Sequence, residues 1–170
     1  MKKRIALLLA VVLVMFAVLV ACKDGGENPP NGDDHIYSFS YNGVNIAPGD
    51  SFAEIQSRLG NPTSYFEAAS CAFDGNDKIY TYGGNVQVSV SSLAGVDTVF
   101  MVTLLDDAVA TPEGICVGSA KEQVTVAYGE GVDNGTSLVY AAGNTELVFL
   151  IRDGCVTSVQ YRYTDTAAAR

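Results

Sequence analysis

Two segments of the chain carry apolar side chains at helical spacing. The first runs from Gly49 to Gly60 and places three apolar residues on one face of a helix, namely Phe52, Ile55 and Leu59. Asp50 or Ser51 is suited to the N-cap of this helix, and Gly60 favours a left-handed C-cap. We therefore predict a short helix with one buried face between the two glycines.

The second segment, from Gly118 to Gly129, repeats this pattern 69 residues later. Ser119 is suited to its N-cap. In both segments an acidic residue falls in the first turn, where the helix dipole favours it. The apolar face of this segment carries Val124, Ala127 and Tyr128. We predict a second short helix here.

Segments with the pattern of β-strands follow each predicted helix. Val86–Val90 alternates apolar and polar residues, with Gln87 and Ser89 on the polar face, and Leu147–Ile151 is a continuous apolar run. Glycine-rich turn signals separate these segments from their neighbours. We therefore predict an antiparallel meander of about three strands after each helix.

These similarities divide the chain into two predicted tandem repeats that form one globular domain. Residues 36–106 form repeat 1 and residues 107–165 form repeat 2. Val96–Val99 in the first matches Val156–Val159 in the second at an offset of 60. Two helix-plus-meander repeats place both helices on one face of a combined sheet, so the predicted fold class is α+β.

One predicted strand, Val99–Leu105, is apolar on both faces. Alternation places Phe100, Val102 and Leu104 opposite a core face that carries Val99 and Met101. Two interpretations remain open. The rest of the fold covers both faces of a central strand, or the three residues form an exposed stripe that binds a partner. Phe100, Val102 and Leu104 are therefore the candidate partner-binding face.

The chain begins with the pattern of an export signal. Three basic residues precede an uncharged run from Ile5 to Ala21, so we predict a signal peptide in residues 1–21. Residues 22–35 are rich in glycine, proline and acidic residues and cannot bury enough apolar surface to fold. We predict a disordered acidic tether there.

Charge excludes one class of partner. The chain has 170 residues, with 10 basic and 19 acidic side chains. Residues 1–21 hold three of the basic residues and no acid, which leaves 7 basic and 19 acidic residues and a net charge of −12 after cleavage. Nucleic acid and anionic lipid headgroups require clustered lysine and arginine. We therefore expect neither of them as a ligand of the folded domain.

Catalytic and metal-binding motifs are also missing from the sequence. His35 is the single histidine and falls in the tether, which argues against histidine-dependent nucleophiles and ordinary zinc sites. Paired carboxylates for glycoside hydrolysis remain open, because Asp and Glu are plentiful. We predict a protein that is not an enzyme and has no catalytic residue, cofactor or metal.

Three cysteines follow Cys22, namely Cys71, Cys116 and Cys155. One disulfide among them leaves one thiol over. Cys116 precedes the second predicted helix, and Cys155 lies in the last hairpin of the same repeat. We favour a Cys116–Cys155 disulfide, with three buried, inert thiols as the alternative.

The end of the signal segment, Leu19-Val20-Ala21-Cys22, is similar to the lipobox of bacterial lipoproteins. The resemblance implies cleavage after Ala21, a diacylglycerol thioether on Cys22, and a new amino terminus that can take a further acyl chain such as palmitate. Two acyl chains give stable membrane attachment. The chain is then lipid-anchored on the extracytoplasmic face of a bacterial cell envelope. An uncleaved anchor or a secreted protein with a chance cysteine are the alternatives.

The two helix segments share the pattern Gly-[Ser/Asp]-x3-[Glu/Gln]-[Ile/Val]-x4-Gly, and each precedes a meander. This arrangement, over Tyr41–Tyr163, resembles the β-lactamase inhibitory protein fold, and one copy alone resembles the small lipoproteins of the outer-membrane assembly machine. The resemblance implies protein binding on a concave sheet face. The chain departs from the inhibitor because it has no Trp and too few cysteines for the inhibitor's two disulfides.

These observations lead to one functional expectation. The chain is a membrane-anchored lipoprotein that acts as a non-enzymatic binding module for another extracytoplasmic protein. An inhibitor of an exported enzyme is the first alternative, and a cell-wall hydrolase is a weaker one. Fold resemblance does not identify the partner.

Overall fold

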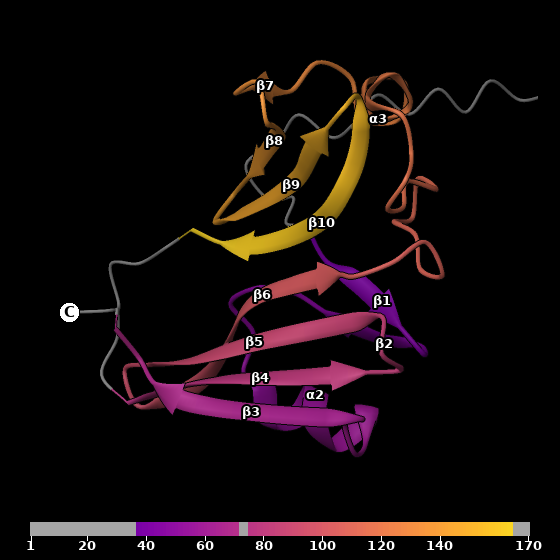
Figure 1. Cartoon of the computed structure of the whole chain (residues 1–170). Coiled ribbons are helices and arrows are strands. Elements are labelled where there is room, and N and C mark those ends of the chain that lie inside the picture. Colours follow the sequence, from indigo (N-terminus) through magenta and orange to yellow (C-terminus); the bar gives the residue numbers. More distant parts are fainter. Residues whose placement is uncertain (1–36, 72–74, 165–170) are drawn as a thin grey trace, which may run out of the picture. The chain divides into compact units, whose positions relative to one another are not determined.

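The computed structural model describes residues 37–71 and 75–164 (Figure 1). The predicted signal peptide, the lipidation site Cys22 and the tether lie outside the described residues. So do the last predicted residue of repeat 2 and the residues beyond it.

Both predicted helices are present, and each ends at the expected glycine. α2 spans Phe52–Leu59 and α3 spans Lys121–Tyr128, and the C-cap residues Gly60 and Gly129 have φ angles of 76° and 77°. This positive φ is a conformation that glycine adopts without strain. The apolar faces point inward as predicted.

The N-cap predictions hold for one helix only. Ser51 is the N-cap of α2, but its side chain makes no capping bond. The N-cap of α3 is Ala120, not Ser119, and the Ala120 N–H donates to Gln123 Oε1 at 2.8 Å. Ser119 Oγ instead accepts a hydrogen bond from the Cys116 N–H at 3.1 Å. The serine therefore stabilises the turn before the helix.

Four strands follow each helix, one more than predicted. The first set is β3 (Ser64–Ala69), β4 (Asn76–Tyr82), β5 (Val86–Leu93) and β6 (Val96–Leu104); the second is β7 (Val132–Asp133), β8 (Ser137–Ala142), β9 (Thr145–Arg152) and β10 (Cys155–Tyr163). The additional strands, β3 and β7, are exposed along their whole length. They lack the alternation that marks a half-buried strand.

The two meanders join into one eight-stranded antiparallel sheet in the order β3-β4-β5-β6-β10-β9-β8-β7 (Figure 1). β6 and β10 form the junction, with Val159 opposite Leu104 and Arg162 opposite Met101. The chain therefore has a mixed α+β fold with the last strands of the two meanders side by side.

A pair of backbone hydrogen bonds ties each helix entry to the last strand of its own half. The bonds join the following groups: Gly49 N–H to Val99 O (2.8 Å), Val99 N–H to Asp50 O (2.9 Å), Gly118 N–H to Val156 O (2.8 Å) and Val156 N–H to Ser119 O (2.8 Å). Val99 and Val156 thus take corresponding places, which are 57 residues apart. The offset of 60 predicted for these strands is wrong by three residues.

A hairpin that precedes α2 completes the core. β1 (Phe39–Tyr41) and β2 (Val44–Ile46) are joined by an Asn42-Gly43 turn in which both residues have positive φ, as a tight hairpin turn requires. Phe39 packs against Tyr161 of β10, with ring centroids 5.7 Å apart. The N-terminal hairpin therefore contacts the C-terminal strand.

One face of the sheet bears the whole hydrophobic core. The buried residues of α2, α3 and the hairpin belong to a single cluster with one side of the sheet. Figure 1 shows α2 and the hairpin behind the sheet.

Neither helix within residues 37–71 and 75–164 is long and apolar enough to cross a membrane.

Candidate functional site

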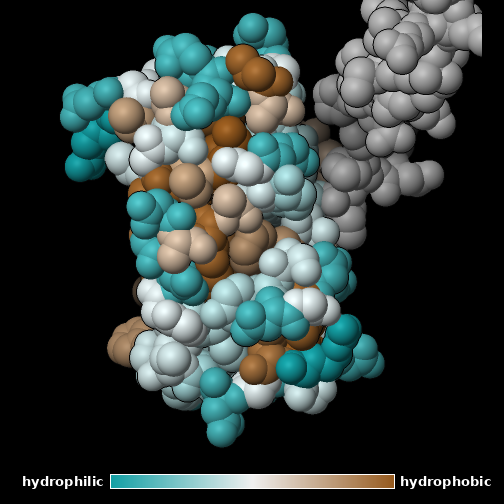
Figure 2. Space-filling model, turned by 90° about the vertical axis from the view of Figure 1, so that its right-hand side faces the viewer, coloured by the Kyte–Doolittle hydropathy of each residue, from teal (hydrophilic) through white to brown (hydrophobic). Residues whose placement is uncertain are grey.

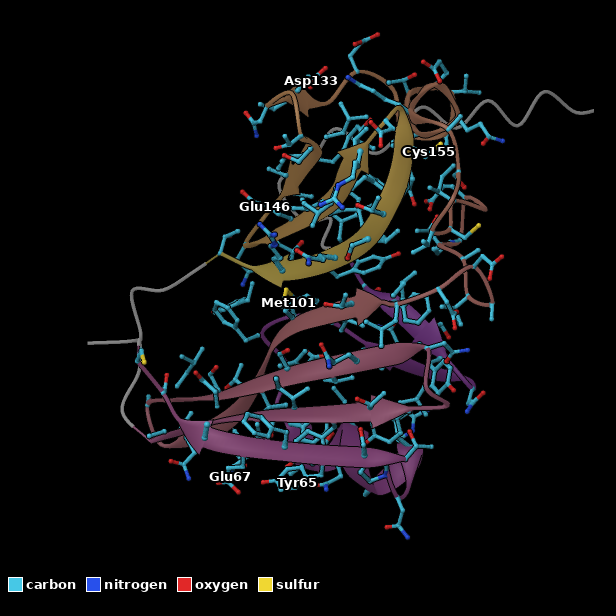
Figure 3. The ribbon with its side chains drawn as sticks, viewed as in Figure 1. Tyr65, Glu67, Met101, Asp133, Glu146 and Cys155 are labelled. Carbon is cyan, nitrogen blue, oxygen red and sulfur yellow. The ribbon has the colours of Figure 1, made fainter. Side chains whose placement is uncertain are left out.

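The sheet face opposite the core is the candidate site, and we call it the open face. Residues that stand directly opposite one another in antiparallel strands share a face. Strand register therefore gives two rows that cross the sheet: Phe66, Ile79, Ser89, Met101, Arg162, Glu146 and Ala141 in one, and Thr81, Gln87, Thr103, Gln160, Val148, Val139 and Val132 in the other. The face looks toward the viewer in Figure 3, where Met101 is labelled at the junction of the two meanders.

The two ends of the open face differ in polarity. Across β4–β6 it carries hydroxyl and amide side chains, including Gln87 and Ser89, which the alternation of β5 had assigned to the polar face. Across β7–β9 it carries valines, an alanine and a leucine. The apolar end is where a partner gains most from excluding water.

This apolar end is hollowed. A concavity of about 570 Å³ lies over β7–β10, and its lining includes Val132, Val139, Val148, Leu150, Glu146 and Arg162. Val148 is only 1 % exposed although no described helix covers it, because the neighbouring side chains surround it. Val132, on the short edge strand, is 64 % exposed. The hollow thus has a buried floor and a hydrophobic rim.

One end of the hollow carries a charge of each sign. Glu146 and Arg162 stand opposite each other on β9 and β10. Arg162 Nε also donates to Gln160 Oε1 at 2.9 Å, which fixes the direction of the guanidinium. An oriented pair of opposite charges beside an apolar floor gives specificity to a protein contact.

The edge strand β3 borders the polar end of the open face. Phe66 is 60 % exposed there. Tyr65 and Glu67, which Figure 3 labels, lie on the other side of the strand. The Tyr65 hydroxyl donates to Glu67 at 2.5 Å, and Asn76 Nδ2 donates to the same carboxylate at 2.7 Å. These two donors hold the pKa of Glu67 below its usual value, and the bond raises the pKa of Tyr65. The edge is therefore ordered by its own side chains.

The predicted partner-binding residues do not form an exposed stripe. Val102 and Leu104 are completely buried in the core, and Phe100 is half-buried. A β-bulge explains the error. Val90 pairs with Val99 and Ser89 with Met101, so Phe100 is one extra residue of β6 in this register. The extra residue shifts the alternation by one, so that Val102 and Leu104 join Val99 on the core face.

The apolar periodicity of the chain does not identify the residues of the hollow. Leu147–Ile151 is a continuous apolar run, and periodicity alone does not show which of its residues face the core. Strand register settles the matter, because Leu147 and Phe149 lie in the core and Val148 and Leu150 line the hollow. The one available signal was the continuous apolar run itself, which indicates a strand with apolar residues on both faces.

The three described cysteines are free thiols. The structure therefore does not contain the favoured Cys116–Cys155 disulfide. Cys71 and Cys155 are exposed, so the alternative of three buried thiols is also wrong. Cys155, the first residue of β10, forms a β-bridge with Ala120, which is the N-cap residue of α3. Cys116 Sγ lies 3.6 Å from Ser119 Oγ, just before that helix. The two cysteines belong to the same corner of the fold without being bonded.

Among residues 37–71 and 75–164, no three His, Cys, Asp or Glu side chains are grouped closely enough to hold a metal ion. The described ion pairs, Lys78–Asp97 at 2.6 Å and Lys121–Asp133 at 2.5 Å, lie outside the hollow. The geometry of the open face thus offers shape, apolar area and one residue of each charge, Glu146 and Arg162, for recognition.

Comparison with known proteins gives fold likenesses. No family model matches the chain, and neither does any curated protein. An extracellular SCP-domain protein from Bacillus anthracis str. Ames matches with a TM-score of 0.45 and 11 % identity, over 83 % of this chain and 52 % of that one. This chain thus spans about half the length of that protein. A DUF4309 family protein, YjgB, from Bacillus subtilis subsp. subtilis str. 168 matches with a TM-score of 0.45 and 17 % identity, over 72 % of this chain and 83 % of that one.

Proposed function

We propose that this chain is a lipid-anchored extracytoplasmic protein that binds another extracytoplasmic protein through the open face of its sheet, without catalysis. The observation that carries the proposal is the hollow over β7–β10. It combines a buried apolar floor, an exposed apolar rim at Val132 and a charge pair at Glu146 and Arg162. An apolar centre beside polar groups is the usual composition of a protein interface.

The proposed location rests on the N-terminal sequence. A basic start, an uncharged run and Leu19-Val20-Ala21-Cys22 follow the order of a lipoprotein signal. Lipidation of Cys22 and a tether in residues 22–35 place the folded domain close to the membrane surface, where it meets extracytoplasmic partners.

We also propose that the two halves are repeats of one unit. Each consists of a helix and a four-stranded meander, and each ties its helix entry to a valine of its last strand. A bulge follows that valine in both halves, at Phe100 in β6 and at Thr157 in β10. The hollow occupies only the second half, which explains how two similar units present one binding site.

Capture with matched variants tests the binding proposal. The full chain is immobilised in mild detergent and exposed to envelope and culture-medium proteins, and the retained proteins are identified by mass spectrometry. Val132→Glu places a charge on the rim of the hollow and is expected to lower retention of the dominant protein at least tenfold. Val126→Glu makes the same change on the exposed side of α3, where Val126 is 87 % exposed, and this variant should still retain the dominant protein.

Equal retention by the two variants would show that the open face is not the binding site. A captured enzyme is then assayed with and without the chain, which separates an inhibitor from a binding module. The anchor is tested independently with Cys22→Ala, which should move the chain from the membrane fraction to the soluble fraction. Retention in the membrane would contradict lipid attachment at Cys22.

A further inference from the structure

A second cavity lies on the core side of the sheet, away from the hollow. It has a volume of about 260 Å³, several times that of a water molecule, and its lining includes Tyr37, Pro112, Glu113, Tyr128, Leu147 and Tyr161. Leu147 and Tyr161 are core-face residues, whereas their neighbours Val148 and Arg162 line the hollow. The two sites are therefore on opposite faces of the sheet.

The loop from β6 to α3, which contributes Pro112 and Glu113, runs along the side of the molecule that faces the viewer in Figure 2. Apolar residues gather in the middle of that side, between hydrophilic ends. The cavity is thus formed where this loop, the beginning of the N-terminal hairpin, the end of α3 and strands β9 and β10 meet.

The hydroxyl and carboxylate oxygens that line this cavity can accept hydrogen bonds. The Tyr128 hydroxyl donates its proton to Glu113 Oε2, so its oxygen can only accept further hydrogen bonds, as it does from the Thr111 side chain. The Tyr161 side chain is 1 % exposed, and its hydroxyl has no hydrogen-bond partner among the described residues. A buried hydroxyl without a partner costs free energy, and a ligand that supplies N–H groups removes this cost.

The cavity also carries a negative charge beside aromatic rings. The described ion pairs use Asp97 and Asp133, and neither includes Glu113. Glu113 lines the cavity together with Tyr37 and Tyr161, and its carboxylate adds to the effect of burial in raising the pKa of both tyrosines. Three tyrosines and one carboxylate attract a cation by charge and by the ring quadrupoles.

We propose that the cavity binds a primary alkylammonium group, either free or at the end of a lysine side chain. The acceptors at Glu113, Tyr128 and Tyr161 match the three N–H donors of such a group, while Leu147 and Pro112 contact its alkyl chain. A quaternary ammonium ion has the charge but no N–H donor, so it satisfies none of these acceptors and binds more weakly.

The test measures binding of three small probes to the full chain by NMR titration. n-Butylammonium is expected to bind saturably in the millimolar range, 1-butanol of similar shape without a charge is expected not to bind, and tetramethylammonium is expected to bind at least several-fold more weakly. Nα-acetyl-lysine amide is the fourth probe. If this probe binds, the cavity accepts a lysine side chain. If butylammonium binds and this probe does not, the natural ligand is a free amine.

Two variants and one control assign the binding to the cavity. Glu113→Gln removes the charge and keeps an oxygen that accepts from Tyr128, and it should weaken butylammonium binding about tenfold, as expected for loss of a charge-assisted bond. Tyr161→Phe removes only the partnerless hydroxyl and should weaken binding several-fold while the domain stays folded. Glu54→Gln, on α2 and outside the cavity, should change nothing.

Saturable binding of butanol with the same affinity would overturn the proposal, because the site would then recognise shape without charge. Equal affinity in Glu113→Gln and in the unsubstituted chain would overturn it too. So would the absence of butylammonium binding up to about a hundred millimolar, far above the millimolar dissociation constant of a weak site. Circular dichroism of each variant confirms the fold, and Tyr161→Phe keeps the test decisive if Glu113→Gln is unstable.

Discussion

Thr145 and Thr103 are both buried in the sheet, and their hydroxyls have different surroundings. Thr145 Oγ1 donates to the Ala142 carbonyl at 2.9 Å and accepts from the Tyr37 N–H at 2.8 Å, which attaches the beginning of the hairpin to β9. Thr103, on the open face, is 7 % exposed, and its hydroxyl has no partner among the described residues. The same side chain therefore stabilises one site and costs free energy at the other.

Substitution by valine, which has nearly the same shape, separates these two effects. Thr145→Val is expected to lower the free energy of unfolding by about 1–3 kcal/mol, because it leaves the half-buried Tyr37 N–H without the Thr145 acceptor. Thr103→Val is expected to leave that free energy unchanged or to raise it. Urea denaturation of both variants checks this difference. A Thr103→Val loss as large as that of Thr145→Val would contradict the assignment of a partnerless hydroxyl.

At the scale of single elements, β6 shows how one bulge reverses the assignment of a strand. Regular alternation from Val99 places Met101 in the core and Val102 outside. The extra residue at Phe100 reverses this, so Val102 is buried and Met101 is half-exposed at the junction of the two meanders (Figure 3). The bulge comes directly after Val99, whose backbone bonds to Gly49 and Asp50 before α2. The residues after the bulge, from Met101 on, pair with β10.

Serine substitutions at these two adjacent residues distinguish the two alternations. Val102→Ser is expected to lower the free energy of unfolding by about 2–4 kcal/mol, since it leaves a small cavity and buries a hydroxyl. Met101→Ser should cost less than about 1 kcal/mol, as is usual at sites near the surface. Chemical denaturation of the pair measures both values. A larger loss for Met101→Ser would mean that regular alternation continues through Phe100.

The elements that could be predicted from the sequence are those with a strong local signal. Both helices combine apolar periodicity with a terminal glycine, and β5 alternates cleanly around Gln87 and Ser89. The exposed strands β3 and β7 have no such signal, because their place is set by backbone pairing at the sheet edges. The site was predicted poorly for the same reason. A bulge and a strand register are properties of paired strands, which one strand's own sequence does not show.

At the scale of the whole molecule, the two halves share one core. The sheet is continuous across β6 and β10, and Phe39 from the first half packs on Tyr161 from the second. Tyr37 also binds Thr145 of β9. The hairpin thus belongs to the first half by sequence and stabilises the second by contact, so neither half has a complete core.

This shared core predicts that the domain unfolds as one unit. Thermal unfolding followed by circular dichroism and by tyrosine fluorescence should give coincident single transitions, as expected of two-state domains below about 150 residues. A chain that ends at residue 106 exposes Leu104, Val102 and Phe39, which the second half covers, and should remain unfolded. A folded fragment 1–106, or two separate transitions, would show that the halves are independent domains. The hollow, whose lining residues all lie between Val132 and Arg162, would then be a site of the second half alone, and its occupation would not stabilise the first. With one shared core, butylammonium binding must raise the unfolding temperature of the entire domain, because a ligand that binds only the folded state stabilises all that unfolds with its site.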